Sequence, residues 1–420
     1  MPADRGSSVR TVDLSAAKER MQAAVQARAG ALLEASHQIH EHPELNYEEH
    51  FAHDLLTGIL ADEGLAVERH AHGLDTAFVA RAGSSGPTVA VLCEYDALPG
   101  IGHACGHNII ATAGLGAGLA AASLAEELGG RVVVIGTPAE EGGGGKILLA
   151  REGAFDGVDA ALMIHPAGYD LCRMDVIAVQ ELTAEYRGEA AHAAAFPHRG
   201  RNALDAAVLG YVNVAALRQH IRPTERIHGI FTGGGDKPNI VPAWAQTEWM
   251  VRSGSIRTLE PLKARVAACL EAGALASGCE VELHWKPVVY ADMLDNDVLV
   301  GLYAANSASL GRPLQEPDPK QAVVGSTDMG NISYVVPSIH PMIQAAPAGV
   351  PIHTPEFAGH ARSETGDRAV LDGATALAWT VADLWLQDGV LAAAQAEFAA
   401  TIAAVGPEAQ RSAIRGGAAT

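Results

Sequence analysis

The sequence predicts an α/β protein whose main domain has a mainly parallel sheet flanked by helices and is interrupted by a smaller, two-layer α+β domain. Apolar runs typical of buried strands alternate with helical segments up to about residue 177, and a period-two pattern takes over from about 178 to 291. A length of 420 residues also favours two domains. We therefore divide the chain into a discontinuous domain, 13–177 and 292–405, and an inserted domain, 178–291.

The main domain begins with helices and continues with strands that alternate with helices. From Ser15 to about Leu65 the pattern is helical; Pro43 divides it into two helices, and Gly64 lies where a C-terminal cap belongs. Helices are also expected at 109–128 and in "KILLAREGAF". The predicted strands are the apolar runs "TAFVARAG", "PTVAVLCEYDALPG", "RVVVIGTPAEE" and "DAALMIHPAG".

The inserted domain is predicted to be one sheet with helices on one face. Four segments alternate apolar and polar residues, namely "VIAVQELTAEYRGEAAH", "RIHGIFTGGG", "AQTEWMVRS" and "VELHWKPVVY". The two amphipathic helices are "NALDAAVLGYVNVAALRQHI" and "LEPLKARVAACLEAGALASG". After about Asp292 the chain returns to a buried strand, "VPSIHPMIQAA", and ends in alanine-rich helices at 365–387 and 390–404.

Composition and charge exclude two classes of partner. The chain has 29 Lys and Arg against 49 Asp and Glu, a formal net charge of −20, so neither nucleic acid nor an anionic membrane is an expected partner. The Ala/Gly-rich stretch 109–125 is too short to span a bilayer. The opening "MPADRGSSVRTVDLSAAKER" lacks the apolar core of a secretory signal, and five irregularly spaced cysteines do not indicate a disulfide framework. We expect a cytoplasmic protein.

Potential metal donors follow the predicted strands, at the edge where ligands collect in an open α/β sheet. Each donor alone has a plainer explanation, such as a solvated turn or a hydrogen-bonded core histidine. Their joint arrival from separate strands at one edge favours a metal site over these explanations. The donors are His103, Cys105, His107, Glu140, Glu141, His165 and His353.

The number and type of donors indicate two divalent metal ions that share a bridging ligand. Thiolate with imidazole favours zinc, and the carboxylates leave manganese or cobalt as alternatives. In an extended segment neighbouring side chains diverge, so Glu140 and Glu141 should differ in role, one as a ligand and the other as a base for water. By the same geometry Cys105 and His107 should point the same way. The run "GGGGK" is not a phosphate loop, because Ile147 follows the lysine.

Five motifs, in order along the chain, resemble the M20 metallopeptidases, and in particular the p-aminobenzoyl-glutamate hydrolases and related dipeptidases of their amidohydrolase branch. They are "HPELNYEE", "CEYDALPGIGHACGHN", "GTPAEEGGGGK", "AHAAAFPHRGRNALDA" and "NIVPAWA". The resemblance implies a two-metal catalytic domain with an inserted lid domain through which a homodimer forms. It also implies Glu140 as general base and acid and Cys105 as the bridge. The implied metal ligands are Cys105, His107, Glu141, His165 and His353.

The resemblance extends to the inserted domain and has two departures. His192 resembles the histidine that stabilises the oxyanion, and Asn239 resembles the asparagine that helps to hold the substrate carboxylate or the oxyanion. The wider family has a His-x-Asp motif where this chain reads "EYD", so we leave Glu94 and Asp96 out of the ligand set, as well as His103. The "GSTDMG" segment also differs from the Glu-Asp-Phe of the branch.

We therefore expect hydrolysis of an amide bond in an N-acyl or aminoacyl amino acid by metal-activated water, with Glu140 moving the proton. Aminobenzoyl-glutamate-like compounds, unusual dipeptides and N-acyl amino acids are the candidate substrates. Arg199 and Arg201 are candidates to bind a substrate carboxylate by a bidentate fork. Two alternatives are a catalytically degenerate binding or scaffolding protein on the same fold and a purely structural zinc protein.

Overall fold

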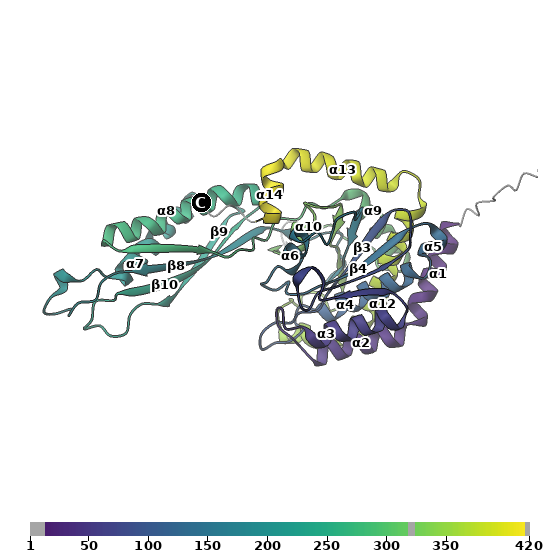
Figure 1. Cartoon of the computed structure of the whole chain (residues 1–420), viewed down its shortest axis with the longest axis horizontal. Helices are drawn as coiled ribbons and strands as arrows, with labels where there is room; N and C mark the ends of the chain where they lie inside the picture. The colour runs from purple at the N-terminus through teal and green to yellow at the C-terminus, as the bar shows by residue number, and fades with distance from the viewer. Residues whose placement is uncertain (1–12, 318–323, 416–420) are drawn as a thin grey trace, which may run out of the picture. The chain divides into compact units, whose positions relative to one another are not determined.

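The computed structural model describes residues 13–317 and 324–415 (Figure 1). The expectation of a cytoplasmic location rests partly on residues 1–12, which lie outside the described residues. The described residues form two compact units. The first unit contains the described residues of Met1–Met174, Asp295–Ala322 and Val335–Ala400, and the second unit contains those of Asp175–Leu294, Val323–Tyr334 and Thr401–Thr420.

The division drawn from the sequence differs from these units at four places. It assigned 175–177, 292–294, 324–334 and 401–405 to the main domain, whereas the structure groups these described residues with the second unit. The side-chain amide of Asn331 shows why, since it is buried and donates hydrogen bonds to the backbone oxygens of Val289 and Ala413. Contacts of this kind join residues distant in sequence and leave no periodic signal.

A six-stranded sheet in the order β1-β2-β4-β3-β5-β13 forms the centre of the first unit. Strands β4, β3, β5 and β13 are parallel to one another, whereas β2 is antiparallel to both β1 and β4. The predicted α/β class with a mainly parallel sheet is confirmed. The strands of this unit are β1 (Ala66–Arg69), β2 (Phe78–Ala82), β3 (Thr88–Glu94), β4 (Arg131–Thr137), β5 (Ala160–Leu162), β13 (Ser338–Ile339) and the separate parallel pair β6 (His165–Ala167) and β14 (Met342–Gln344).

The helices of the first unit include those predicted, but two of the predicted helices are divided, and α9 and α11 were not predicted. The expected helix 109–128 is α4 followed by α5. The expected helix before Pro43 is two helices, because the backbone leaves the helical region at Arg28 (φ −103°, ψ 2°). The helices are α1 (Leu14–Ala27), α2 (Ala29–Glu41), α3 (His50–Asp62), η1 (Ala71–Gly73), α4 (His107–Ala122), α5 (Ala125–Leu128), α6 (Gly145–Arg151), α9 (Asp297–Ser309), α11 (Pro355–His360), α12 (Glu364–Leu386) and the part of α13 (Val390–Val405) up to Ala400.

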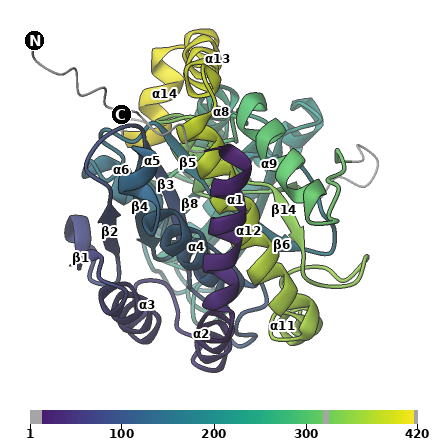
Figure 2. The same cartoon turned by 90° about the vertical axis from the view of Figure 1, so that its right-hand side faces the viewer.

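Helix α4 is the central helix of the first unit. Every residue from His107 to Ala121 is buried, because α4 packs against β3 and β4 and also against α1, α2 and α12 (Figure 2). A helix buried on all sides has no polar face, which explains its Gly/Ala-rich sequence. This packing fixes the first residue of α4, His107, near the carboxyl end of β3.

The second unit is a two-layer α+β structure, as predicted. Its sheet has the order β11-β8-β10-β9 with antiparallel pairing throughout, and α7 and α8 pack on it (Figure 1). The Asn202 side chain caps α7 by accepting from the backbone N–H of Leu204 at 3.0 Å. The elements are β7 (Asp175–Val176), β8 (Ala178–Arg187), η2 (Pro197–Arg199), α7 (Ala203–Leu217), η3 (Arg218–His220), β9 (Arg226–Gly233), β10 (Trp244–Ser253), α8 (Ile256–Ser277), β11 (Glu280–Trp285), β12 (Val324–Gly325), α10 (Met329–Ile332) and α14 (Pro407–Arg415).

Among the described residues, one helix is long and apolar enough to cross a bilayer by length and composition. It is α12, and 83% of its most apolar window is buried inside the structure. Helices α13 and α14 pass the same test only together, and they are bent by 96° at the break between them. The burial of α12 is what a core helix shows, and it agrees with the packing of α12 on α4.

Candidate metal centre

Four segments of the first unit bring six of the seven predicted donors together, and His103 belongs to none of the groups that could hold a metal among the described residues. Cys105 and His107 lie between β3 and α4, Glu140 and Glu141 lie in the turn after β4, and His165 begins β6. The fourth segment precedes α11 and carries His353, whose backbone N–H donates to Ala104 O at 2.8 Å. A backbone hydrogen bond therefore connects the His353 segment to the Cys105 loop, in addition to the side chains.

The ligand atoms of these residues form three overlapping groups, and within each group they lie within 4.8 Å of one another. The Cys105 Sγ atom lies 3.4 Å from His165 Nε2, and Glu141 Oε1 lies 3.4 Å from His353 Nε2. The groups are Cys105 with His107 and His165, Cys105 with Glu141 and His353, and His107 with Glu140 and Glu141. Cys105, His107 and Glu141 each belong to two groups, and Cys105 is the member shared by the group that contains His165 and the group that contains His353.

Unusual backbone geometry occurs at this cluster. Ala139 and His353 both have left-handed backbones, with φ of 58° and 63°, and such conformations in residues other than glycine cost free energy that the surrounding structure must supply. Gly106 has φ of 78°, and a Cβ there would lie 2.6 Å from Pro166 Cγ. Only glycine fits this turn between Cys105 and His107.

Asp96 connects two of the donor segments. Its Oδ1 accepts a hydrogen bond from His107 Nδ1 at 2.9 Å, and its Oδ2 accepts one from the backbone N–H of Glu141 at 2.9 Å. The first contact fixes the imidazole so that Nε2 faces the cluster, which is how metal-binding histidines are commonly oriented. Asp96 is thus a positioning residue for both His107 and Glu141.

The "HPELNYEE" segment holds the turn that carries the two glutamates. The fully buried Glu49 accepts a hydrogen bond at Oε1 from the backbone N–H of Ala139 at 2.8 Å. The hydroxyl of Tyr47 donates to Gly143 O at 2.6 Å on the other side of the turn. These two contacts stabilise the left-handed conformation of Ala139, directly before Glu140.

The donor set fits divalent cations. His107 Nε2 and Glu141 Oε1 are buried without a hydrogen-bond partner among the described residues, although buried polar atoms are normally paired. Burial, followed by the charge of His107, lowers the pKa of His165 to about 4, which favours the neutral imidazole that binds metals. Burial raises the pKa of the Cys105 thiol, and a nearby cation is what makes such a thiol a ligand.

Comparison with known proteins identifies the family. The model of Peptidase family M20/M25/M40 matches residues 90–370, more than half of the chain. The chain belongs to this family. The resemblance inferred from the sequence is thereby confirmed, and so is the enzyme class, a metallo-amidohydrolase or dipeptidase.

Relatives of this M20 family member cover nearly its whole length. It is 39% identical over 413 residues to a protein named Xaa-Arg dipeptidase in Mus musculus, covering 94% of this chain and 95% of that protein. It is 29% identical over 447 residues to a p-aminobenzoyl-glutamate hydrolase protein of Escherichia coli (strain K12), covering 89% and 93%. A solved dinuclear metal-binding peptidase of the M20 family from Bacillus subtilis matches with a TM-score of 0.66 at 19% identity, covering 86% of this chain and 99% of that one, which shows the shared fold.

The premise of an extended segment was wrong at two places in this family member. Glu140 and Glu141 lie in a turn, and their carboxylates are equally far, 3.9 Å, from His107 Nε2. Cys105 and His107 do share a donor group, but a left-handed Gly106 and the start of α4 bring them there in place of an extended loop. The two-residue period applies to strands and does not apply to turns.

The other predicted site residues belong to the second unit and are exposed. His192 and Asn239 lie on adjacent segments, where Val241 N–H donates to Ala191 O at 2.9 Å and His192 forms a backbone bridge with Ile240. Arg199 lies over the ring of Phe196, with its Cζ 4.7 Å from the ring centroid. Arg201 pairs with Glu189 at 3.3 Å.

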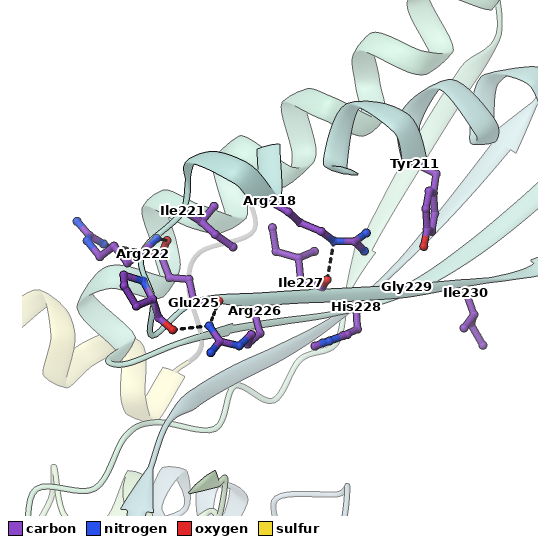
Figure 3. Close-up of a pocket in the computed structure, with 11 residues that line it drawn as sticks. Tyr211, Arg218, Ile221, Arg222, Glu225, Arg226, Ile227, His228, Gly229 and Ile230 are labelled. Atoms are coloured by element: carbon purple, nitrogen blue, oxygen red, sulfur yellow. Dashed lines mark hydrogen bonds and ion pairs between the residues drawn. The ribbon is translucent and has the colours of Figure 1, made fainter. Parts of the chain in front are cut away.

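A cavity of about 690 Å³ in the second unit holds none of the predicted site residues (Figure 3). Its basic side chains are engaged separately. Arg222 pairs with Glu225 at 2.9 Å, Arg226 donates to backbone oxygens, and Arg218 donates to a backbone oxygen of β9 at 2.8 Å. Because these groups do not converge on one point, the cavity lacks the arrangement of a ligand site.

Proposed function

We propose that this M20 enzyme hydrolyses the amide bond between an aminoacyl or acyl group and an amino acid, and that a dipeptide ending in a basic amino acid is its substrate class. The observation that carries the hydrolytic proposal is the cluster of carboxylate, imidazole and thiol donors in the first unit, in which Cys105, His107, Glu140 and His165 are buried, Glu141 is partly buried and His353 is exposed. The Xaa-Arg dipeptidase of Mus musculus, similar over 94% of this chain, supports the choice of substrate.

Two divalent cations, zinc first and manganese or cobalt as alternatives, are the proposed cofactors. The proposed ligands are Cys105, His107, Glu141, His165 and His353. Cys105 suits the bridging position because it is the residue that the group with His107 and His165 shares with the group with Glu141 and His353. When bound, such cations supply Lewis acidity for activating water and polarising the amide carbonyl.

Glu140 is the proposed general base and acid. Its carboxylate lies 3.9 Å from His107 Nε2, and it is absent from the group formed by Cys105, Glu141 and His353. Glu140 would accept a proton from the attacking water and return it to the leaving nitrogen. Glu140→Gln should reduce turnover by about 10²–10⁴-fold, because general acid–base catalysis contributes about this much, while the metal content measured by elemental analysis stays unchanged. A fully active variant would refute this role.

The proposed substrate contacts are on the second unit. His192 would offset the oxyanion, with its ring held by the hydrogen bond from Ala195 N–H to Nδ1 at 3.2 Å. Asn239, Arg199 and Arg201 would bind the substrate carboxylate. Ala substitution of either arginine should raise KM more than it lowers kcat. A KM unchanged by both substitutions would show that neither arginine binds the substrate.

The substrate proposal is tested with a panel of amides and metal-reconstituted protein, followed by mass spectrometry of the products. Dipeptides with C-terminal Arg or Lys should give the highest kcat/KM. Preferred cleavage of p-aminobenzoyl-glutamate would instead favour the substrate named for the relative in Escherichia coli. A protein that binds metal and cleaves no member of the panel would favour the binding or scaffolding alternative.

A homodimer through the second unit is proposed from its surface. Val208, Leu209 and Val212 on α7 are exposed, as are Ile230 and Phe231 on β9, the edge strand of the sheet. Exposed apolar groups next to an unpaired strand edge favour association. Light scattering should give twice the 43.5 kDa chain mass.

The dimer proposal has a matched pair of variants. Val212→Asp should reduce the mass measured by light scattering to that of one chain. Leu275→Asp, at the 83% exposed Leu275 of α8, should leave the dimer intact. A monomeric wild-type protein, or a Val212→Asp variant that stays dimeric, would contradict the proposed surface.

A further inference from the structure

A buried ion pair lies next to the donor cluster. Lys146, in the first turn of α6, and Glu94, the last residue of β3, are both fully buried, and Lys146 Nζ pairs with Glu94 Oε1. Lysine is among the residues least often fully buried. Removing one partner of such a pair strands a charge in a medium of low dielectric constant, so the two side chains depend on each other.

The glycine run after the catalytic turn brings Lys146 to this place. Gly144 has a left-handed backbone with φ of 64°, and a Cβ on Gly145 would lie 1.9 Å from Pro138 O. The chain therefore folds back closely on the end of β4, which pairs with β3. The ion pair with Glu94 accounts for the lysine of "GGGGK".

The second oxygen of Glu94 faces a metal donor. Glu94 Oε2 lies 3.6 Å from His107 Nε2, and both atoms are buried without a hydrogen-bond partner among the described residues. Asp96 holds the other ring nitrogen of His107. The His107 ring thus lies between two carboxylates. The Asp96 carboxylate is hydrogen-bonded to the ring, and the Glu94 carboxylate is paired with Lys146.

We propose that Lys146 and Glu94 form a positioning pair that keeps His107 Nε2 available to a cation. By holding Oε1, Lys146 fixes the direction of the Glu94 carboxylate and keeps it from moving into the donor cluster. Neither residue is proposed to touch substrate or to take part in proton transfer. This inference rests on the metal centre of the proposed function.

Two substitutions disturb the pair in different ways. Lys146→Met removes the anchor, so that the Glu94 carboxylate is free to enter the cluster and alter the coordination. In Glu94→Gln the lysine still selects the amide oxygen, which turns the amide NH₂ toward His107 Nε2, where it competes with a cation. In the double variant the amide is free to rotate and neither residue of the pair carries a charge, so metal binding should recover.

The test is titration of the metal-free full-length protein with Co²⁺, with the affinity measured against a competing chelator and the visible spectrum recorded. Wild-type protein comes first, because failure to bind Co²⁺ would refute the metal centre itself, separately from the pair. Each single variant should bind Co²⁺ roughly 10- to 100-fold more weakly with a changed spectrum, and the double variant should approach wild type.

The matched control is Lys18→Met. Lys18 pairs with Asp383 at 2.7 Å in the same unit, between α1 and α12. This control should lose thermal stability and keep wild-type affinity and spectrum. Folded single variants with wild-type Co²⁺ binding, or a control that loses as much affinity, would overturn the proposal. Failure of both single variants to fold, with normal binding by the double variant, would assign the pair to folding alone and also overturn it.

Discussion

Replacing Glu49 by glutamine should make the stability of the protein less dependent on pH. Burial, with a contribution from the charge of Asp96, raises the pKa of Glu49 from 4.5 to about 7, against the opposing hydrogen bond from Thr76. Glutamine has nearly the same shape. It can still accept the N–H of Ala139 and contact Thr76, and it has no proton to lose.

The direction in which stability changes with pH depends on whether the folded or the unfolded chain keeps the proton of Glu49. Below pH 4.5 the Glu49 carboxyl is protonated in the folded and the unfolded chain, and between 4.5 and about 7 only the folded chain retains the proton. The stability that Glu49 contributes is therefore complete below pH 4.5 and is lost as the pH rises to about 7. This shift of the pKa from 4.5 to about 7 corresponds to about 3 kcal/mol, at about 1.4 kcal/mol per pKa unit.

Urea unfolding of both proteins at a series of pH values in one metal-containing buffer measures the effect. From about pH 5 to about pH 8 the wild-type free energy of unfolding should fall by about 3 kcal/mol relative to Glu49→Gln. The comparison requires equal m-values, so that both proteins expose the same surface on unfolding. A difference that stays constant over this range, or that grows in favour of the wild type, would refute the reasoning.

Two further predictions concern the donor loop. Asp96→Asn leaves one acceptor where the structure uses two, for His107 and for the Glu141 N–H, so metal affinity measured against a chelator should fall roughly 10- to 100-fold; an unchanged affinity would argue against positioning by Asp96. Gly106→Ala, with φ of 78° and a contact at 2.6 Å, should lower the free energy of unfolding by about 1–3 kcal/mol more than Gly129→Ala, which has φ of 66° and no atom within 4 Å. Equal losses of unfolding free energy in the two variants would show that the residues around Gly106 move to accommodate the added methyl group.

The main features of the fold and the donor residues were readable from the sequence because they depend on local patterns. Buried parallel strands appear as continuous apolar runs, and half-exposed strands alternate. This distinction separated the mainly parallel sheet of the first unit from the antiparallel sheet of the second unit. The structure shows their strand orders to be β1-β2-β4-β3-β5-β13 and β11-β8-β10-β9. Donors placed after strand ends, such as Cys105 and His165, follow from the same pattern.

The residues that orient the donors were not readable. Asp96 was left out of the ligand set because the chain reads "EYD" where the wider family has His-x-Asp, and its role as a positioning residue depends on contacts with His107 and with the Glu141 backbone. Glu49 acts on Ala139, 90 residues away, through one hydrogen bond. Such contacts have no period and no spacing rule, so a single sequence gives no signal for them beyond the presence of a polar residue.

By itself, the sequence determined which elements form and which chemical groups reach one edge of the sheet, because hydrophobic periodicity and composition act over a few residues. The tertiary structure alone decided the direction of each side chain at that edge. Left-handed turns at Gly106, Ala139 and His353 and the buried pair of Lys146 with Glu94 set those directions. Their free-energy cost is met only by packing and hydrogen bonds from distant parts of the chain.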